Sequence, residues 1–274
     1  MTIITRPQTL MTRRQALIGG LAGSGLLLTG CSKVLQIDAL TDSMSFQRVL
    51  AVAQSWTRAT QRFLLGGGQM AREYEPSDIS PHFKANGTLD PGGQDYERHV
   101  AEGFVNWHLK IDGMVAHPLT LSVADLRRLP SRSQITRHDC VEGWSAIGGW
   151  RGVPLGLLLR AAGVRAGARY VVFYCADNLD GDPAKGGEQS PGQYYESIGL
   201  ADAMHPQTII AYDMNGKPLD VAHGAPLRLR VERQLGYKMA KYVRHIQLVS
   251  DFRAIAGGHG GYWEDQGYDW YAGI

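Results

Sequence analysis

The sequence has few cysteines, little net charge and no long hydrophobic run, and each shortage excludes a class of protein. Three cysteines among 274 residues are too few for an iron–sulfur cluster held by about four cysteines, and the CxxCH motif of covalently attached haem is absent. The CxxC and HExxH spacings that mark zinc sites are missing as well. The apolar run at residues 16–28 is too short for a membrane-spanning helix of about 20 residues.

The small net charge is unevenly distributed. There are 28 Lys and Arg residues against 26 Asp and Glu residues, a formal charge of +2, but Arg6, Arg13 and Arg14 lie in an acid-free segment of thirty residues. Without these three arginines the sequence has 25 basic and 26 acidic residues, and its formal charge is −1. Because nucleic-acid and polybasic membrane surfaces depend on clustered cations, this nearly neutral body argues against both. A hydrophobic content of 44% predicts one sizeable globular domain and not a disordered chain.

Residues 1–30 are predicted to be an export signal, since two arginines precede an apolar, Gly-rich run and small residues before Cys31. The pattern resembles a twin-arginine signal combined with a lipobox, whose cysteine is lipidated and becomes the mature N-terminus. Because that route resembles one that exports proteins already folded around a cofactor, a cofactor is expected. Ser32 stands where an inner-membrane lipoprotein would carry Asp, which favours outer-membrane attachment facing the periplasm. The alternative is an ordinary buried helix.

The rest of the chain is divided by its patterning. Residues 31–75 are predicted to form a lipid-anchored helix and linker, with apolar residues three to four positions apart over 41–65. Residues 76–93 carry three Pro and three Gly, which predicts a long irregular connection. Strands are expected over 107–113, 134–140, 170–175, 208–214, 227–231 and 242–249, and helices over 122–130 and 154–163. Because strands and short helices follow no regular βαβ rhythm, the fold class is α+β with mixed sheets.

Cys140 and Cys175 remain once Cys31 is assigned to the anchor, and two interpretations are open for them. In an oxidising compartment they would form a disulfide. Against this, residues 138–145 are polar, aromatic and Gly-bearing, and a thiolate is a soft ligand for a transition metal. A metal with one cysteine ligand takes its other ligands from an organic cofactor.

The stretch around Cys140 resembles the sulfite-oxidase-like molybdopterin proteins, and within them the periplasmic methionine-sulfoxide reductase branch. The resemblance covers roughly residues 80–250 and implies a molybdopterin-binding oxidoreductase domain over 76–250. It rests on ordered motifs at residues 83–87 (FKANG), 140–145 (CVEGWS), 150–155 (WRGVPL), 202–206 (DAMHP), 215–219 (NGKPL), 223–228 (HGAPLR) and 236–241 (GYKMAK).

The resemblance implies a molybdenum cofactor whose metal is bound by Cys140, and no haem or iron–sulfur cluster in this chain. Asn86 and Gly87 would line the pterin, and Cys175 would be a free thiol against the cofactor. The groups expected to hold the pterin or its phosphate are His223, Arg228, Lys238, Met239, Ala240 and Lys241.

Residues 251–274 form a Gly-rich aromatic segment that is predicted to pack on the active site. Relatives place a tyrosine a few residues after a tryptophan beside the metal oxygen, and Tyr268 after Trp263 is the counterpart. Its phenol could donate a hydrogen bond during oxygen transfer. The alternative is a tail that covers apolar surface.

The resemblance implies oxygen-atom transfer with molybdenum cycling between Mo(IV) and Mo(VI), in the direction of reducing a small or protein-bound S-oxide or N-oxide. Sulfite-oxidising relatives carry Arg five residues after the cysteine, where this chain has Ser145. The alternatives are a sulfite dehydrogenase and a cofactor-free, disulfide-stapled binding lipoprotein. Electrons are expected from a separate protein, a membrane haem protein or a cytochrome. A monomer is expected, because the chain lacks the C-terminal domain that dimerises many sulfite oxidases.

Overall fold

The computed structural model describes residues 56, 68–180 and 191–274, and the features below belong to the compact unit Gly68–Ile274. The predicted export signal, the Cys31 anchor and, apart from Trp56, the helix expected over 41–65 lie outside the described residues. Among the helices that are described, none combines the length and the apolar character needed to cross a membrane.

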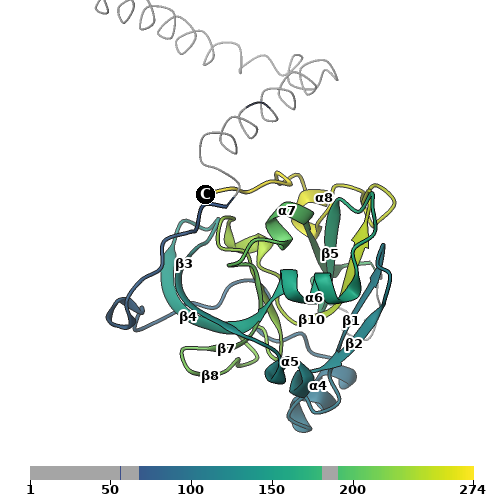
Figure 1. Ribbon diagram of the computed structural model, residues 1–274. Coiled ribbons are helices and arrows are strands. Elements are labelled where there is room, and N and C mark those ends of the chain that lie inside the picture. Colours follow the sequence, from purple (N-terminus) through teal and green to yellow (C-terminus); the bar gives the residue numbers. More distant parts are fainter. Residues whose placement is uncertain (1–55, 57–67, 181–190) are drawn as a thin grey trace, which may run out of the picture. The chain divides into compact units, whose positions relative to one another are not determined.

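Two five-stranded sheets make up the unit (Figure 1). In the first, the strand order is β2-β1-β10-β5-β6, and the β1–β10 pair is parallel while the other pairs are antiparallel. Its strands are β1 (His108–Gly113), β2 (Leu119–Ser122), β5 (Tyr170–Asn178), β6 (Gln193–Gly199) and β10 (Val243–Val249).

The second sheet is antiparallel throughout, with the order β3-β4-β7-β8 and with β9 also paired to β7. In Figure 1 it lies to the left of the first sheet. Its strands are β3 (Arg132–Asp139), β4 (Ser145–Pro154), β7 (Ile209–Met214), β8 (Lys217–Pro218) and β9 (Arg228–Arg230).

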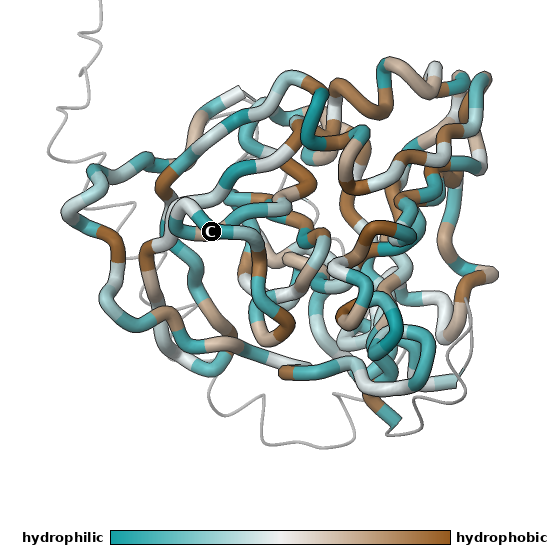
Figure 2. Tube along the Cα trace, turned by 90° about the horizontal axis from the view of Figure 1, so that it is seen from below, coloured by the Kyte–Doolittle hydropathy of each residue, from teal (hydrophilic) through white to brown (hydrophobic). Residues whose placement is uncertain are grey.

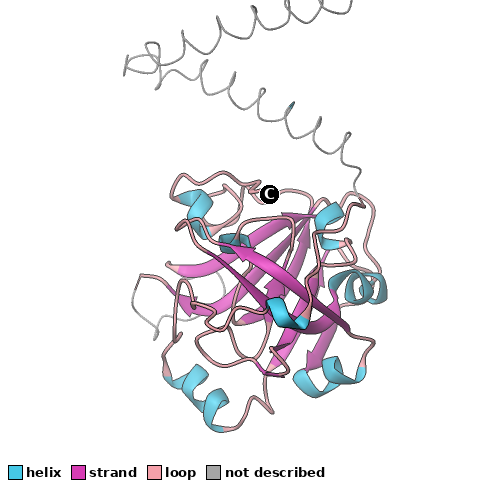
Figure 3. Ribbon diagram, turned by 90° about the vertical axis from the view of Figure 1, so that its left-hand side faces the viewer, coloured by secondary structure: helices cyan, strands magenta, loops and turns pink. Residues whose placement is uncertain are grey.

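The helices are short and lie around the outside of the strands (Figure 3). Mixed sheets with short helices confirm the predicted α+β class. The described helices are η1 (Pro76–Asp78), α4 (Gln94–Ala101), α5 (Val123–Arg128), α6 (Leu155–Ala162), α7 (Leu200–Ala203), η3 (Gly236–Lys238) and α8 (Tyr262–Asp265).

The largest apolar core gathers inward-facing residues from both sheets, and strand alternation decides which residues enter it. On β5, Val171 and Phe173 join this core, while Val172 and Tyr174 join a second cluster on the opposite face. Ile255 of the C-terminal segment belongs to that second cluster. Both faces of β5 are therefore covered, which explains why its sequence is a continuous apolar run and not an alternating one. Along most of the remaining trace, brown apolar stretches in Figure 2 are short and alternate with teal polar ones.

Local signals in the sequence set several element boundaries. The Ser122 hydroxyl accepts from the Asp125 backbone N–H at 3.1 Å, and the Asp125 carboxylate accepts from the Ser122 N–H at 3.1 Å. A capping box therefore starts α5, which lies within the helix expected over 122–130. Gly163 ends α6 in the left-handed region, with φ of 70°. Pro154 is the N-cap of α6 and not its first residue, one position from the prediction.

Gly152 is predicted to be indispensable for the pairing of β4 with β7. At this point the register of the two strands shifts, and a Cβ on Gly152 would lie 2.1 Å from the Ile210 carbonyl oxygen. Because backbone atoms cannot move aside cheaply, Gly152→Ala should lower the free energy of unfolding by about 1–3 kcal/mol in chemical denaturation. Gly149→Ala on the same strand is the control, since its nearest neighbour would be at 3.5 Å. Equal stability of the two variants would contradict this account.

Candidate active site

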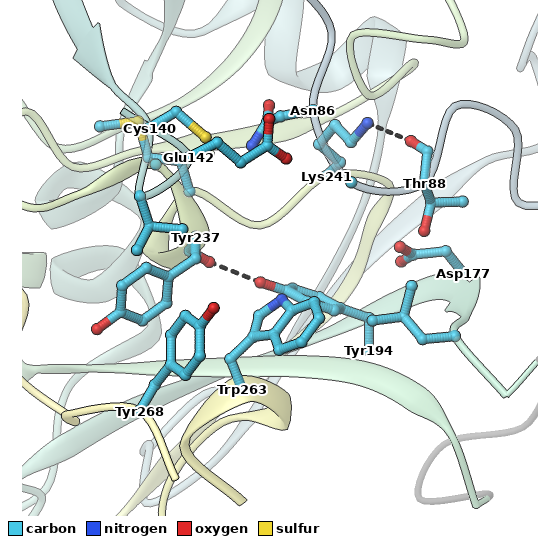
Figure 4. A pocket seen from close by; sticks show the side chains of 15 residues that line it. Asn86, Thr88, Cys140, Glu142, Asp177, Tyr194, Tyr237, Lys241, Trp263 and Tyr268 are labelled. Carbon is cyan, nitrogen blue, oxygen red and sulfur yellow. Dashed lines mark hydrogen bonds between the residues drawn. The ribbon is translucent and has the colours of Figure 1, made fainter. Parts of the chain in front are cut away.

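A cavity opens where loops and strand ends from separate parts of the unit meet (Figure 4). It encloses about 750 Å³ of empty volume, part of which is open to solvent. Its lining of aromatic and apolar side chains with a few polar groups suits an organic cofactor or a small-molecule substrate. The lining residues are Asn86, Gly87, Thr88, Cys140, Val141, Glu142, Asp177, Leu179, Tyr194, Gly236, Tyr237, Met239, Lys241, Trp263 and Tyr268.

Cys140 is the first residue of the loop that joins β3 to β4. The last pair of that hairpin is Asp139 with Ser145, and the Cys140 N–H donates to the Trp144 carbonyl at 2.9 Å. Gly143 supplies the left-handed conformation that closes the turn, with φ of 85°, and its N–H donates to the Cys140 carbonyl at 3.0 Å. The thiol is thus fixed on a short, rigid turn with 8% of the residue exposed.

The thiol of Cys140 is free, and so is that of Cys175. The disulfide considered from the sequence is therefore not formed in this structure. Burial raises the pKa of Cys140, which Lys84 and Arg228 partly oppose. A bound metal cation would reverse this effect and hold the thiolate.

Asn86 and Gly87 lie in the irregular connection predicted over residues 76–93, and His223 contacts the backbone of this connection. The Nε2 of His223 lies 3.1 Å from the Phe83 carbonyl oxygen, and Nδ1 lies 2.7 Å from an Asp220 carboxylate oxygen. His223 therefore stays outside the cavity lining and fixes the loop that carries Asn86 and Gly87.

Lys241 and Met239 line the cavity, whereas Ala240 between them turns into the main core. The Lys241 ammonium donates to the carbonyls of Thr88 and Ala222. Burial, followed by the nearby Arg228, lowers the pKa of Lys241 to about 7. An anionic ligand in the cavity would favour the protonated form.

Arg228 is buried next to the cavity without lining it. One guanidinium nitrogen donates to the His223 carbonyl at 3.2 Å, and the group lies over the Trp150 ring at 5.2 Å. Its Nε and Nη2 have no hydrogen-bond partner within the described part of the chain. Burial, followed by Arg230, lowers the pKa of Arg228 to about 9. Such a group needs an acceptor that the protein does not provide.

Lys238 and Cys175 lie elsewhere than the sequence motifs suggested. The Lys238 ammonium is fully buried and donates to Glu196 and Glu264, so it does not face the cavity. Cys175 follows Phe173 on the inward face of β5, is completely buried and belongs to the main core. Strand alternation and the two glutamates, which the motifs do not encode, account for both differences.

Aromatic side chains form the wall near Cys140. The rings of Trp263 and Tyr268 lie 5.4 Å apart and those of Tyr237 and Tyr268 lie 5.3 Å apart. The Tyr194 hydroxyl donates to the Tyr237 carbonyl at 2.6 Å. Tyr268 is 39% exposed and stands at the open side.

Glu142 brings a carboxylate to the same side. It accepts from the Lys84 ammonium at 2.9 Å and from the Trp144 indole N–H at 3.0 Å. The hydrogen bond from Lys84 keeps the pKa of Glu142 below its usual value. The cavity wall near Cys140 is therefore aromatic with one carboxylate whose charge a neighbouring lysine offsets.

Sequence reasoning did not assign several lining residues. Thr88 directly follows the predicted pair in its loop, and Asp177 is a charged residue at the end of an apolar strand. The sequence shows where both residues lie along the chain, but only the folded structure shows that Thr88 and Asp177 line the same cavity. The other unassigned lining residues are Val141, Glu142, Leu179, Tyr194, Gly236 and Tyr237.

Comparison with known proteins now defines the class. Residues 98–254 match the family model described as an oxidoreductase molybdopterin binding domain. The chain belongs to this family of molybdopterin-binding oxidoreductases, which confirms the family and the enzyme class predicted from the sequence.

Two known proteins are similar to the chain. One is a protein of Azospira oryzae that bears the name protein-methionine-sulfoxide reductase subunit YedZ1. It is 36% identical over 261 residues, which span 95% of this chain and 86% of the relative. The other is the sulfane dehydrogenase SoxCD of Paracoccus pantotrophus, with a TM-score of 0.46 and 24% identity. That match covers 54% of this chain and 39% of the SoxCD chain.

The residues around the cavity suit a molybdopterin. A soft sulfur ligand lies on a rigid turn, and buried guanidinium and ammonium groups next to it match a phosphate. The Asn86 Oδ1 atom and two nitrogens of Arg228 are buried without partners in the described structure. Gly87 leaves its surroundings open, with no atom within 4 Å of a built Cβ. A bound pterin phosphate would accept from the two Arg228 nitrogens, and the Asn86 oxygen would accept from an N–H group of the pterin.

Lys238 is predicted to be essential for stability. Burial raises the pKa of Glu196 well above its usual value, and the Lys238 ammonium is the first influence that opposes this rise. Lys238→Met leaves two buried carboxyl groups without their shared ammonium and should cost about 3–5 kcal/mol in denaturant unfolding. Glu196→Gln keeps the ammonium paired with Glu264 and should cost much less. A Lys238→Met protein as stable as the parent would refute the ion-pair role.

Proposed function

We propose that the protein reduces a sulfoxide in the periplasm with electrons from a separate redox protein. The observation that carries this proposal is the cavity lining near Cys140, which is aromatic and bears a carboxylate, Glu142. A neutral sulfoxide with apolar substituents fits such a wall, whereas the sulfite dianion would find the nearby Lys84 ammonium already paired with Glu142. The name of the Azospira relative, a protein-methionine-sulfoxide reductase subunit, supports the same direction.

Ser145 adds a second reason to favour the sulfoxide. Sulfite-oxidising relatives are expected to carry a cation at this position, whereas the Ser145 hydroxyl donates to Asp139. Among the lining residues Lys241 is the one cation, and it is balanced by Glu142 and Asp177. The lining therefore lacks the excess positive charge that would concentrate a dianion.

In the proposed reaction a sulfoxide takes up two electrons and two protons and yields a sulfide and water. The cofactor, when bound, supplies the oxygen-atom and electron transfer. Cys140 would hold the metal through its thiolate, and the rigid turn keeps that sulfur in place. Trp263 and Tyr237 pack against the substituents of the sulfoxide and exclude water. The Tyr268 hydroxyl donates a hydrogen bond to the sulfoxide oxygen and keeps a proton close to it.

A substrate screen tests this proposal. Molybdenum-loaded protein should oxidise a reduced artificial donor with methionine sulfoxide or dimethyl sulfoxide, and sulfite with an artificial acceptor should turn over at least about tenfold more slowly. Trimethylamine N-oxide covers the N-oxide class. Faster sulfite oxidation would favour the sulfite dehydrogenase alternative.

Cys140→Ser is the control for that screen. It should remove both turnover and bound molybdenum while circular dichroism remains that of the parent. Full turnover in this variant, or purified parent protein without molybdenum, would contradict the proposal that Cys140 binds a molybdenum cofactor.

The location is a separate part of the proposal, and it rests on Arg13, Arg14 and Cys31. Changing both arginines to lysine in the full chain should leave the protein in the cytoplasmic fraction, because the export signal is lost. Cys31→Ser should instead release the exported protein from the membrane fraction. Arg6→Lys is the matched control and should change neither. Normal export of the double lysine variant would contradict the twin-arginine assignment.

A further inference from the structure

Tyr242 adopts a backbone conformation that a bulky residue rarely takes. Its φ is 55°, in the left-handed region, and its side chain is completely buried in the main core. Such a conformation costs free energy and persists only where the surrounding structure holds it. The Tyr242 carbonyl accepts from the Ala176 N–H at 3.0 Å, which fixes the backbone here to β5. Because Tyr242 directly follows Lys241, a lining residue of the cavity, the strain indicates a function at the cavity.

This conformation brings two consecutive side chains to the same side of the chain. In an extended strand, neighbouring side chains point to opposite faces. Here the Lys241 ammonium lies 5.2 Å from the centre of the Tyr242 ring. The Tyr242 hydroxyl donates to the Thr88 carbonyl at 2.9 Å, and the Lys241 ammonium donates to the same carbonyl, as Figure 4 shows for the lysine. A carbonyl oxygen has two lone pairs, so it accepts both bonds at once.

The Thr88 carbonyl is one of two fixed points that enclose a short loop at the cavity. At the other fixed point, His223 Nε2 lies 3.1 Å from the Phe83 carbonyl oxygen. Residues 84–87 lie between these points and are called the rim loop below; the last two of them line the cavity. The position of this part of the lining therefore depends on the hydrogen bonds at both ends of the loop.

The two donors at Thr88 differ in what else they can bind. The Lys241 ammonium also donates to the Ala222 carbonyl at 2.9 Å, and an anionic ligand in the cavity would compete with both carbonyls for it. The Tyr242 hydroxyl cannot change partner in this way, because its ring is enclosed in the main core and packs edge-on against Tyr96 at 5.5 Å. Burial also raises the pKa of Tyr242, so the hydroxyl keeps the proton that it donates.

We propose that Tyr242 is a positioning residue that fixes the Thr88 end of the rim loop, so that Lys241 can bind an anionic part of the cofactor without releasing this loop. The left-handed backbone makes this possible, since an extended backbone would direct one of the two side chains away from Thr88. Tyr242 is not itself among the residues that line the cavity. The inference rests on the family cofactor and does not depend on the substrate.

Limited proteolysis of the full chain tests this role at the rim loop. Trypsin cleaves after Lys84 when the loop opens, and mass spectrometry quantifies the cut. Tyr242→Phe keeps the ring and removes only the hydroxyl, so this cut should become about two- to tenfold faster, the factor expected for one hydrogen bond. The cut after Arg165, an exposed residue between α6 and β5, is the internal reference and should keep its rate.

Pterin retention is the second readout and needs no turnover. Molybdenum-loaded proteins are dialysed and assayed for pterin by fluorescence after oxidative release, and Tyr242→Phe should lose pterin about two- to tenfold faster than the parent. Tyr96→Phe is the matched control, because that buried hydroxyl donates to the Ala225 carbonyl at 2.7 Å, outside the rim loop. It should match the parent both in the cut after Lys84 and in pterin retention.

Parent-like cleavage and retention in Tyr242→Phe would overturn the proposal, and so would an equal rise of both tryptic cuts, which would make the tyrosine only a core residue. If Tyr242→Phe does not fold, Lys241→Met decides. It should lose pterin, yet its cut after Lys84 should stay within about twofold of the parent, because the tyrosine still holds the loop. A loop that opens in Lys241→Met would assign the fixing role to the lysine. A parent that reduces no sulfoxide would refute only the proposed function.

Discussion

The buried ammonium of Lys238 is the interaction on which the cavity wall depends. It joins Glu196 of β6 and Glu264 of α8 to η3, so three elements distant in sequence meet at one charge. Lys238 directly follows Tyr237, and Glu264 directly follows Trp263, and both aromatic residues line the cavity. Removing one partner of a buried charge is strongly destabilising. The ion pairs of Lys238 therefore fix the positions of Tyr237 and Trp263 in addition to the packing of their rings.

This cluster has a counterpart in and next to the cavity, where two charged side chains have polar atoms without partners in the described residues. Arg228 and Asp177 are buried to about the same degree as Lys238, yet each has polar atoms that the described protein does not satisfy. Buried polar groups without partners cost free energy, and a ligand that supplies those partners regains it. Folding stability and cofactor loading are linked for this reason, since a ligand that binds only the folded chain stabilises it.

Much of the fold was predictable where a local interaction decides the structure. The capping box at Ser122 and the left-handed Gly163 each act within a few residues, and the helices expected over 122–130 and 154–163 were found. The strand β4 was missed, because Gly148 and Gly152 within it have low strand propensity. Its pairing with β3, the other strand of the same hairpin, and with β7, which is distant in sequence, overrides that propensity.

For the candidate site, the motifs predict which residues occur near the cofactor, whereas the fold decides which of their side chains reach the cavity. Ordered motifs identified Cys140, Asn86 and Lys241, which the cavity brings together, because a motif fixes which residues occur near a bound group. A motif does not fix the direction of each side chain. On β5 that direction follows from alternation, which sends Cys175 into the core and leaves Asp177, two residues later on the same face, at the point where the core ends and the cavity begins.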